Sequence, residues 1–370
     1  MRPDIRHRGS SVSSRGIVVR SEYPIDLFGS NEEKFSHDCF LTLPTALLGM
    51  EYYTVHSSPS TLQQQFAITP AENDTEVTVQ LSSTLEGKVE FNRKDYYAGD
   101  IVEFTLSIGD SAQVQTKDTP ALGLSGTRVR SNKPIALFSG NVRTSISLDG
   151  PTQHSRDHLV EQLLPYPRWR NQYYAPSSPM RLYEDIFLFL SKESTRLEIE
   201  NEAGEIVVHS LKAVESKAIR LDSGDSHHYV FTAEKPFQVV RLTASQIKGN
   251  TSLTDPAMLL LLHTDYWKYR YTFALPVFTG GSHGGNYQNV IQIVVEKEKR
   301  AGIQMNDRVI KSSWNIFGST NYATTNIQLE HTRQVTLHHK DNALFMVYLY
   351  GAADKESYAM PCGITLRSWL

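Results

Sequence analysis

GIVVRSEYPIDLFGSN, residues 16–31, aligns without a gap on GTRVRSNKPIALFSGN, residues 126–141. The two stretches lie 110 residues apart and are identical at nine of sixteen positions. Chance does not produce such agreement, so the chain contains an internal repeat, which has to be recognised before single elements are assigned. The identical pairs are Gly16/Gly126, Val19/Val129, Arg20/Arg130, Ser21/Ser131, Pro24/Pro134, Ile25/Ile135, Leu27/Leu137, Phe28/Phe138 and Asn31/Asn141.

Weaker copies follow later in the chain. YVFTAEKPFQVVRL, from Tyr229, keeps a proline at 236, and VTLHHKDNALFMVYLYG, from Val335, keeps only the apolar pattern. We call these copies the leading stretches. After each of the first three, an eight-residue step along the chain ends on a tyrosine. An apolar or aromatic residue lies midway in the step, and an acidic residue precedes it. The steps are Pro44 to Tyr52, Pro165 to Tyr173 and His263 to Tyr271; the midway residues are Leu48, Trp169 and Trp267; the acidic residues are Asp38, Asp157 and Asp255.

These marks predict how the chain is divided. A chain of 370 residues is too long for a usual single core, and its length favours two or three modules of about 100 to 200 residues. We predict repeat copies at 16–125, 126–227 and 228–333, a partial copy at 334–370 and a flexible tail at 1–15.

Short runs rich in Val, Ile, Thr, Phe and Tyr, separated by Gly, Pro, Asn and Asp, are typical of strands and turns. Helical patterns are limited to PTALLGMEYY from Pro44 and DHLVEQLL from Asp157, each two turns at most. We therefore predict an all-β fold of tandem antiparallel β-sandwich-like repeats, because a doubly wound sheet needs long helices between its strands. The predicted strands include TEVTVQL from Thr75, IVEFTLSI from Ile101, IFLFL from Ile186, RLEIE from Arg196, VIQIVVE from Val290 and ALFMVYLYG from Ala343.

Two expectations concern packing. The prolines of the leading stretches lack an amide donor, so they should lie at a strand start or a sheet edge. Units of about 100 residues can each close a core, which favours separate units in a linear series, or beads in a row. Alternatively, the partial copies at the two ends of the chain pair and close the array. Linkers rich in Pro or Ser are absent from the sequence, so we expect neighbouring units to pack tightly.

Composition excludes some classes of protein. A net charge of −3 and a pI near 6.5 argue against nucleic-acid binding, which depends on clustered Lys and Arg. No apolar stretch typical of an export signal follows Met1. The longest apolar run, Ala257 to Leu262, is far shorter than the roughly 20 residues of a membrane span.

The two cysteines, Cys39 and Cys362, are far apart in the sequence. A bridge between them would close nearly the whole chain, and two free buried thiols are the favoured interpretation. Asn73 and Asn250 are candidate glycosylation sites, because each begins an N-x-S/T sequon in a polar stretch.

Residues with catalytic or ligating chemistry have structural interpretations as well. Ser155, Asp157 and His158 contain the residue types of a hydrolytic triad, but near-neighbours on one short segment rarely converge, so we predict helix capping by Ser155 or Asp157. Adjacent strand histidines, at 227/228 and 338/339, point to opposite faces and predict no metal site, and neither does His37 beside Asp38 and Cys39.

Two further segments favour structural roles. The glycine-rich loop TGGSHGGN, residues 279–286, precedes a predicted strand, whereas a phosphate-binding loop needs a helix after it. The aromatic residues of QYYAP, from Gln172, and DYWKYRYTF, from Asp265, belong to the repeated module, which favours core packing over a contact surface.

Three places resemble the IgGFc-binding domain family, found in secreted mucus proteins of vertebrates and in many invertebrate proteins. They are the stretch from Gly16 through DCFLTLPTALLGMEYY, the stretch from Gly126 through DHLVEQLLP, and the closing YGAADKESYAMPCG. The likeness covers nearly the whole chain from about Gly16. Its most specific part comprises Asp157, His158, Leu159, Val160, Glu161, Gln162 and Leu163.

The resemblance implies extracellular placement, a role in mucus, coat or adhesion, and partners among proteins or glycoproteins such as immunoglobulin Fc or mucin. The family tends to carry cysteines flanking the loop before DHLVEQL, and residues 141–156 have none, so this chain departs from the family pattern at that loop. We predict a non-catalytic binding or structural protein that presents loops on a repeated β-scaffold, with no cofactor or metal. The alternative is a carbohydrate-active or other hydrolase on a β-sandwich scaffold.

Overall fold

Antiparallel strands make up nearly all of the regular structure. The structure is a computed structural model that describes residues 9–33, 36–58, 60–117, 120, 122–146, 155–179, 184–222, 227–248, 251–276, 287–329 and 334–365. All six predicted strand runs are strands, so the all-β prediction is confirmed. The helical elements within the described residues are four short 3-10 turns: η1 (Thr45–Leu47), η2 (Tyr166–Arg168), η3 (Thr264–Tyr266) and η4 (Arg300–Gly302).

The first unit is built around the long strand β11, Arg128–Thr144. The early half of β11 lies between β4 and β6, and its later half lies between β5 and β12. Every pairing is antiparallel. The other strands are β1 (Ser11–Ser13), β4 (Gly49–Tyr53), β5 (Gln64–Pro70), β6 (Thr75–Gln80), β7 (Val89–Phe91), β8 (Lys94–Tyr96), β9 (Ile101–Leu106), β10 (Ser111–Gln115) and β12 (Asp157–Gln162).

The second unit repeats this plan around β18, Tyr229–Thr243. The early half of β18 lies between β13 and β15, and its later half lies between β14 and β21. The other strands are β13 (Arg170–Ala175), β14 (Glu184–Ser191), β15 (Thr195–Glu200), β16 (Ile206–Leu211), β17 (Lys217–Asp222), β19 (Gln246–Lys248), β20 (Thr251–Thr254) and β21 (Ala257–Leu260).

In the third unit the long strand is divided into β28, Gln334–His339, and β29, Phe345–Ala353. β28 lies between β22 and β24, and β29 lies between β23 and β30. The other strands are β22 (Arg270–Ala274), β23 (Gln288–Glu296), β24 (Ile303–Met305), β25 (Arg308–Val309), β26 (Asn315–Ile316), β27 (Tyr322–Leu329) and β30 (Glu356–Pro361).

Pro134 and Pro236 lie inside β11 and β18, so the expected strand start or sheet edge is wrong for both. The ladder of β11 with β6 ends at Ser131, and its ladder with β5 begins at Ile135. Pro134 therefore lies where the strand changes partners and no ladder hydrogen bond needs its amide. Pro236 occupies the same place in β18, between the ladders with β15 and β14.

The eight-residue step is a 3-10 turn followed by a strand. Its first residue is the N-cap of the turn and its midway residue is the C-cap, in η1, η2 and η3 alike. The final tyrosine then ties the strand to the long strand of its unit. Tyr52 donates to the Ile135 carbonyl at 2.6 Å, Tyr173 to that of Phe237 at 2.8 Å and Tyr271 to that of Phe345 at 2.5 Å, while the three hydroxyls accept from the N–H groups of Gly49, Arg170 and Lys268.

Aromatic pairs join neighbouring units. Tyr53 follows Tyr52, the tyrosine that hydrogen-bonds the long strand of the first unit. The ring centroids of Tyr53 and Trp169 are 5.7 Å apart. Tyr174 holds the corresponding place in the second unit, 6.2 Å from Trp267 and 4.3 Å from Tyr322. These residues are buried or half-buried in one core cluster that extends over all three units. The expectation that neighbouring units pack tightly is therefore confirmed.

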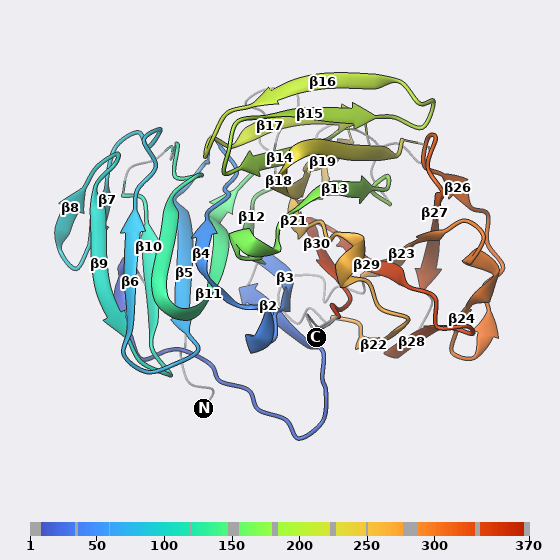
Figure 1. The fold of residues 1–370 in the computed structure, drawn as a ribbon, viewed down its shortest axis with the longest axis horizontal. Helices are drawn as coiled ribbons and strands as arrows, with labels where there is room; N and C mark the ends of the chain where they lie inside the picture. The colour runs from blue at the N-terminus through green and yellow to red at the C-terminus, as the bar shows by residue number, and fades with distance from the viewer. Residues whose placement is uncertain are drawn as a thin grey trace.

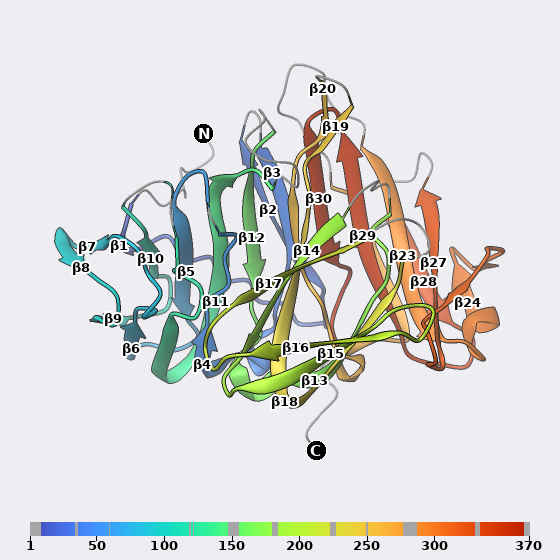
Figure 2. The same ribbon diagram turned by 90° about the horizontal axis from the view of Figure 1, so that it is seen from above.

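The three units surround four central strands, β3 (Ser36–Thr42), β12, β21 and β30 (Figure 1). Seen from above, β3, β12 and β30 lie between the first and third units (Figure 2). Because β3 packs against both β12 and β30, the two ends of the chain meet. Beads in a row is therefore the wrong arrangement, and the alternative in which the ends close the array describes the chain.

The N-terminal region has more structure than a tail. Ser11–Ser13, which we assigned to a flexible tail, form β1 and pair with β10 at the edge of the first sheet. β2, Leu27–Glu33, pairs with β3. The copy boundaries at 126, 228 and 334 stay predictions.

Replacing any tying tyrosine by phenylalanine should destabilise the protein. Tyr52→Phe, Tyr173→Phe and Tyr271→Phe each leave a carbonyl and an N–H without their partner, at a cost of about 1 to 3 kcal/mol in the free energy of unfolding. Chemical denaturation measures it. Tyr269→Phe is the control, since Tyr269 is 50% exposed. Equal losses of unfolding free energy in all four variants would contradict the stabilising role of these tyrosine hydrogen bonds.

Candidate functional site

The DHLVEQL motif forms β12 at the centre of the molecule, so the predicted helix and its capping by Ser155 or Asp157 are wrong. The second helix candidate, from Pro44, is also wrong, because it divides into η1 and β4. Helices this short are marginal by themselves. The packing of β12 between neighbouring strands decides its conformation instead.

The polar side chains of β12 hydrogen-bond the backbone of its neighbours. The Glu161 carboxylate accepts from the Leu260 N–H of β21 at 2.9 Å. Gln162 Oε1 accepts from the Leu43 N–H, just beyond β3, also at 2.9 Å. In return, the Val160 N–H donates to Asp38 of β3 at 3.0 Å. We name β3, β12, β21, β30 and these buried polar groups the junction.

Burial governs the charge of the junction. It raises the pKa of Asp38 well above the ordinary value, and the neighbouring Asp157 raises it further. Burial likewise raises the pKa of Glu161, although the Leu260 N–H opposes this shift. Burial therefore favours the protonated form of both carboxyl groups, because charged groups are costly in a dry interior.

Ser155, Asp157 and His158 do not assemble a triad. Asp157 Oδ1 accepts from the Ser36 hydroxyl and from the His158 N–H rather than from an imidazole. The His158 ring contacts Asn31 at 3.0 Å through Nε2 and the Val142 carbonyl at 3.2 Å through Nδ1. A nucleophile, a base and an orienting acid would have to form one hydrogen-bonded chain.

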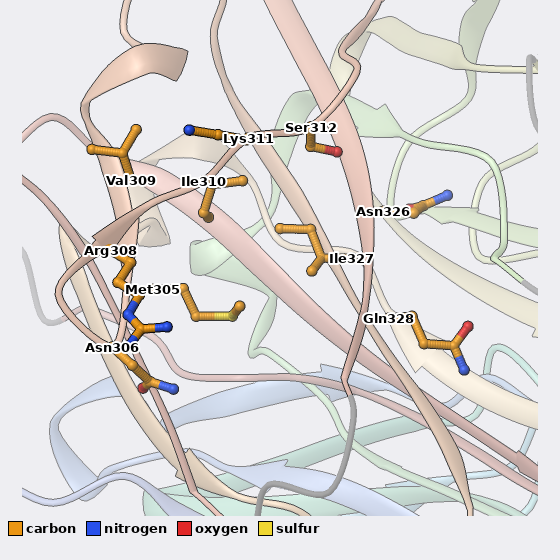
Figure 3. Close-up of a pocket in the computed structure, with 10 residues that line it drawn as sticks. All are labelled: Met305, Asn306, Arg308, Val309, Ile310, Lys311, Ser312, Asn326, Ile327 and Gln328. Carbon is orange, nitrogen blue, oxygen red and sulfur yellow. The ribbon is translucent and has the colours of Figure 1, made fainter.

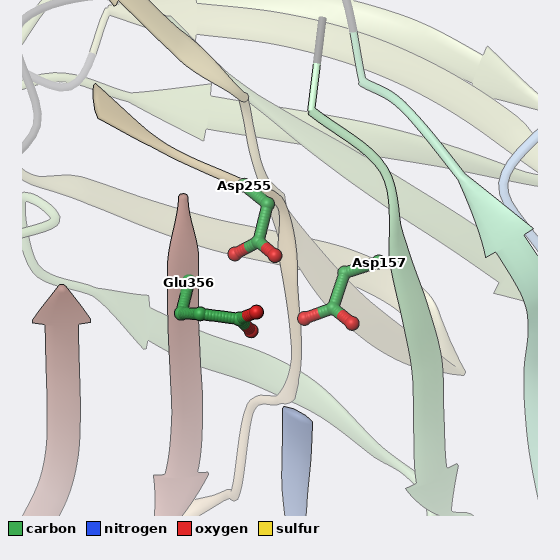
Figure 4. A group of neighbouring side chains, drawn as sticks. All are labelled: Asp157, Asp255 and Glu356. Atoms are coloured by element: carbon green, nitrogen blue, oxygen red, sulfur yellow. The ribbon is translucent and has the colours of Figure 1, made fainter. Parts of the chain in front are cut away.

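Three carboxylates of the junction lie together. Asp157 of β12, Asp255 ahead of β21 and Glu356 of β30 offer oxygens that are all within 4.8 Å of one another (Figure 4). They are the group of described residues that could hold a metal ion, although the sequence predicted none. Asp157 and Asp255 are acidic residues that precede the eight-residue steps, so the repeat marked both of them. No sequence pattern marked Glu356.

Burial, with the charge of Asp157 as a second cause, raises the pKa of Glu356 to about 8, although Arg143 lowers it. Burial also raises the pKa of Asp157 to about 7, against hydrogen bonds from Ser36 and the His158 N–H. Both groups therefore keep a proton more readily in the folded state than in the unfolded chain.

Histidines and cysteines beside the junction have structural partners. His37 lies 2.8 Å from the Tyr287 hydroxyl through Nδ1 and 2.7 Å from Ser30 Oγ through Nε2. Burial lowers the pKa of His37. Cys39 and Cys362 are free, buried thiols, which is the favoured interpretation, and no bridge joins them.

The paired histidines also contact separate partners. His227 lies 3.2 Å from Glu202, whereas His228 accepts from the Ser177 N–H at 3.0 Å. His339 lies 2.8 Å from the Lys299 carbonyl. Within the part of the chain that the structure describes, neither histidine pair belongs to the group of side chains that could hold a metal ion.

Asn73 is exposed in the turn between β5 and β6. Whether it carries sugar stays a prediction. Asn250 and the glycine-rich loop at 279–286 lie outside the described residues. Most aromatic residues of the segments predicted to pack in the core do so, since Tyr173, Tyr174, Tyr266 and Trp267 are buried, whereas Tyr269 is half exposed.

An exposed apolar segment precedes β2. Gly16 donates to the Gly109 carbonyl at 2.9 Å, and Asp26 pairs with Lys268 at 2.5 Å, so the segment 17–25 is held at both ends. Among the described residues, no strand pairs with 17–25. Figure 1 shows this stretch as the long blue connection that leaves the body of the molecule before β2.

This segment is the earlier part of the first copy of the leading stretch, whose later part forms β2, and its surroundings differ from those of β11. Val19 is 49% exposed, whereas its counterpart Val129 is fully buried. Ile25 is 55% exposed, and its counterpart Ile135 is fully buried. Pro24 accordingly lies outside any strand, unlike the prolines of β11 and β18. The same sequence pattern therefore forms a paired strand in β11 but no paired strand at residues 17–25.

A pocket of about 680 Å³ opens between the β24–β25 hairpin and β27 in the third unit. Figure 3 shows Met305, Ile310 and Ile327 around its apolar part. Arg308 and Lys311 supply positive charge, and the pocket has no carboxylate among its lining residues. The remaining lining residues are Asn306, Val309, Ser312, Asn326 and Gln328.

The fold and the junction define a repeated all-β protein in which the DHLVEQL motif packs at the centre, while the segment 17–25 is exposed. The family model described as IgGFc binding protein matches residues 38–351. The chain belongs to the IgGFc-binding protein family, a family of binding proteins, and the resemblance predicted from the sequence is confirmed.

A human relative, IgGFc-binding protein, is 24% identical over 371 residues. The alignment covers 97% of this chain but only 6% of the human protein. A viral chemokine binding protein, R17 of rodent gammaherpesvirus Peru, covers 90% of this chain and 89% of its own at 8% identity with a TM-score of 0.16, and a likeness this low carries no argument. Among the described residues, no helix is long and apolar enough to cross a membrane.

Stability of the metal-free protein should fall as pH rises. The unfolded carboxyls of Asp157 and Glu356 lose protons near their ordinary values of 3.8 and 4.5, while the folded groups hold theirs to about 7 and 8. The stabilisation is thus complete below pH about 4 and is lost by about 8.

Chemical denaturation at several pH values across this range, in the presence of a chelator, measures the slope of the unfolding free energy against pH. Asp157→Asn should flatten it, since the amide oxygen can still accept from Ser36 and the His158 N–H. An unchanged slope in this variant would place the titrating group elsewhere.

Proposed function

We propose that this chain is an extracellular, non-catalytic protein-binding module, and that residues 17–25 receive an extended segment of a partner protein. The observation that carries the proposal is the unpaired copy of the leading strand. Exposed apolar side chains beside unpaired backbone groups favour strand addition, in which the backbone gives affinity and alternate side chains give specificity.

Membership of a family of binding proteins supports this proposal. The name of the human relative attaches IgG Fc to that protein, so Fc is the first partner to test for this chain. An immunoglobulin would be met outside the cell, and an exported chain would pass through the secretory pathway, where the exposed sequon at Asn73 would be open to glycosylation. Mucin glycoproteins, and with them a role in mucus or adhesion, are the second class to test.

Binding of the full chain to immobilised immunoglobulin Fc, to mucin and to a second copy of itself tests the proposal. Val19→Pro removes one amide donor, and Ile25→Asp removes apolar surface. Each should weaken the observed interaction at least tenfold, or about 1.4 kcal/mol. Neither should lower stability, because both side chains are about half exposed.

Val207→Asp is the matched control, since Val207 is 57% exposed on β16 of the second unit, away from residues 17–25. It should bind as the unaltered chain does. Equal binding by Val19→Pro and the unaltered chain, or no binding to any of the three targets, would count against the proposal.

Glycan binding is a second candidate, and the pocket beside β27 favours it. Arg308 and Lys311 would attract an anionic sugar, and the neighbouring Asn and Gln side chains offer both donors and acceptors. The double variant Arg308→Ala and Lys311→Ala should then abolish binding to sialylated or sulfated glycans while leaving neutral glycans unaffected. Retained binding to the acidic glycans would exclude the pocket.

A further inference from the structure

The junction brings three acidic side chains from distant parts of the chain to one point. Residues 157, 255 and 356 are about a hundred positions apart from one to the next, and each lies on a different central segment. Asp157 and Asp255 are fully buried and Glu356 is 5% exposed. Like charges this close in a dry interior repel strongly, so the three cannot all be ionised without compensation.

Hydrogen bonds leave part of this group unsatisfied. Asp157 Oδ1 accepts from Ser36 and the His158 N–H, but its Oδ2 has no donor. Glu356 Oε2 is also buried and has no donor. Figure 4 shows both carboxylates pointing into the space they share with Asp255. A buried carboxylate oxygen without a partner is costly, and a bound ion is one of the few explanations.

The chemistry of the donors selects the kind of ion. The cluster offers carboxylate oxygens, with the Ser357 hydroxyl 3.1 Å from Asp255 Oδ1. Oxygen-only sites suit hard cations, whereas zinc and copper prefer sites with nitrogen or sulfur. Calcium accepts six to eight oxygens in flexible geometry, at about 2.3 to 2.6 Å, which carboxylates supply singly or in pairs.

We propose that Asp157, Asp255 and Glu356 form a calcium site that joins β12, β30 and the segment before β21. The ion would offset most of the negative charge of the buried carboxylates and hold the three segments together at the centre of the molecule. Its role would be structural, and it does not depend on which partner the segment 17–25 or the pocket receives.

Calorimetric titration of calcium chloride into the chelator-treated full chain tests the site. One ion should bind per chain, and the melting temperature should rise with calcium concentration as mass action requires. Glu356→Gln should weaken calcium binding at least tenfold and abolish the rise in melting temperature. Asp157→Asn is a second variant with the same expected result.

Glu161→Gln is the matched control, because Glu161 is also buried on β12 but its carboxylate accepts from the Leu260 N–H outside the cluster. It should keep the calcium response. The proposal is overturned if millimolar calcium neither binds nor changes the melting temperature of the unaltered chain. It is also overturned if Glu356→Gln and Glu161→Gln respond to calcium equally.

If the carboxyl groups share protons instead of a cation, Asp157→Asn and Glu356→Gln should raise the melting temperature in chelator and calcium should have no effect. That result would also overturn the calcium site, while leaving the proposed protein binding untouched.

Discussion

The packing of β3 against β30 is the contact on which the closed arrangement depends. β3 follows the first leading stretch of the chain and β30 follows the last, yet Cys39 of β3 lies in the same core cluster as Phe345 and Cys362. The third unit therefore buries part of its apolar surface against the N-terminal hairpin. Because apolar burial is the main stabilising term in folding, the ends of the chain contribute to one core and not to independent beads.

Buried polar groups give the junction its specificity. Glu161, Gln162 and Asp38 each accept a backbone hydrogen bond from a neighbouring strand or from the residue just beyond it, so each fixes the register of its own strand against another. These three hydrogen bonds favour one arrangement of the strands, because any shift leaves a buried group unpaired. The most specific family motif thus serves packing, which leaves the outer surface for partners.

Repeated local patterns could be predicted from the sequence, and contacts between distant segments could not. The strands at 75–80 and 290–295 followed from alternation and apolar runs, and the step from Pro165 to Tyr173 marked a real structural unit. DHLVEQL looked helical because its local pattern carries no information about the strands on either side of it. Glu356 went unnoticed for the same reason, since only the closed array places it beside Asp157.

Thiol labelling tests the closure directly, because Cys39 and Cys362 come from opposite ends of the chain and are 1% and 0% exposed. Mass spectrometry after brief alkylation at increasing denaturant concentration would follow both thiols. If β3 and β30 share one core, both thiols are protected in the native protein and become reactive in the same unfolding transition. Labelling of Cys39 at a denaturant concentration that leaves Cys362 protected would contradict the closed array.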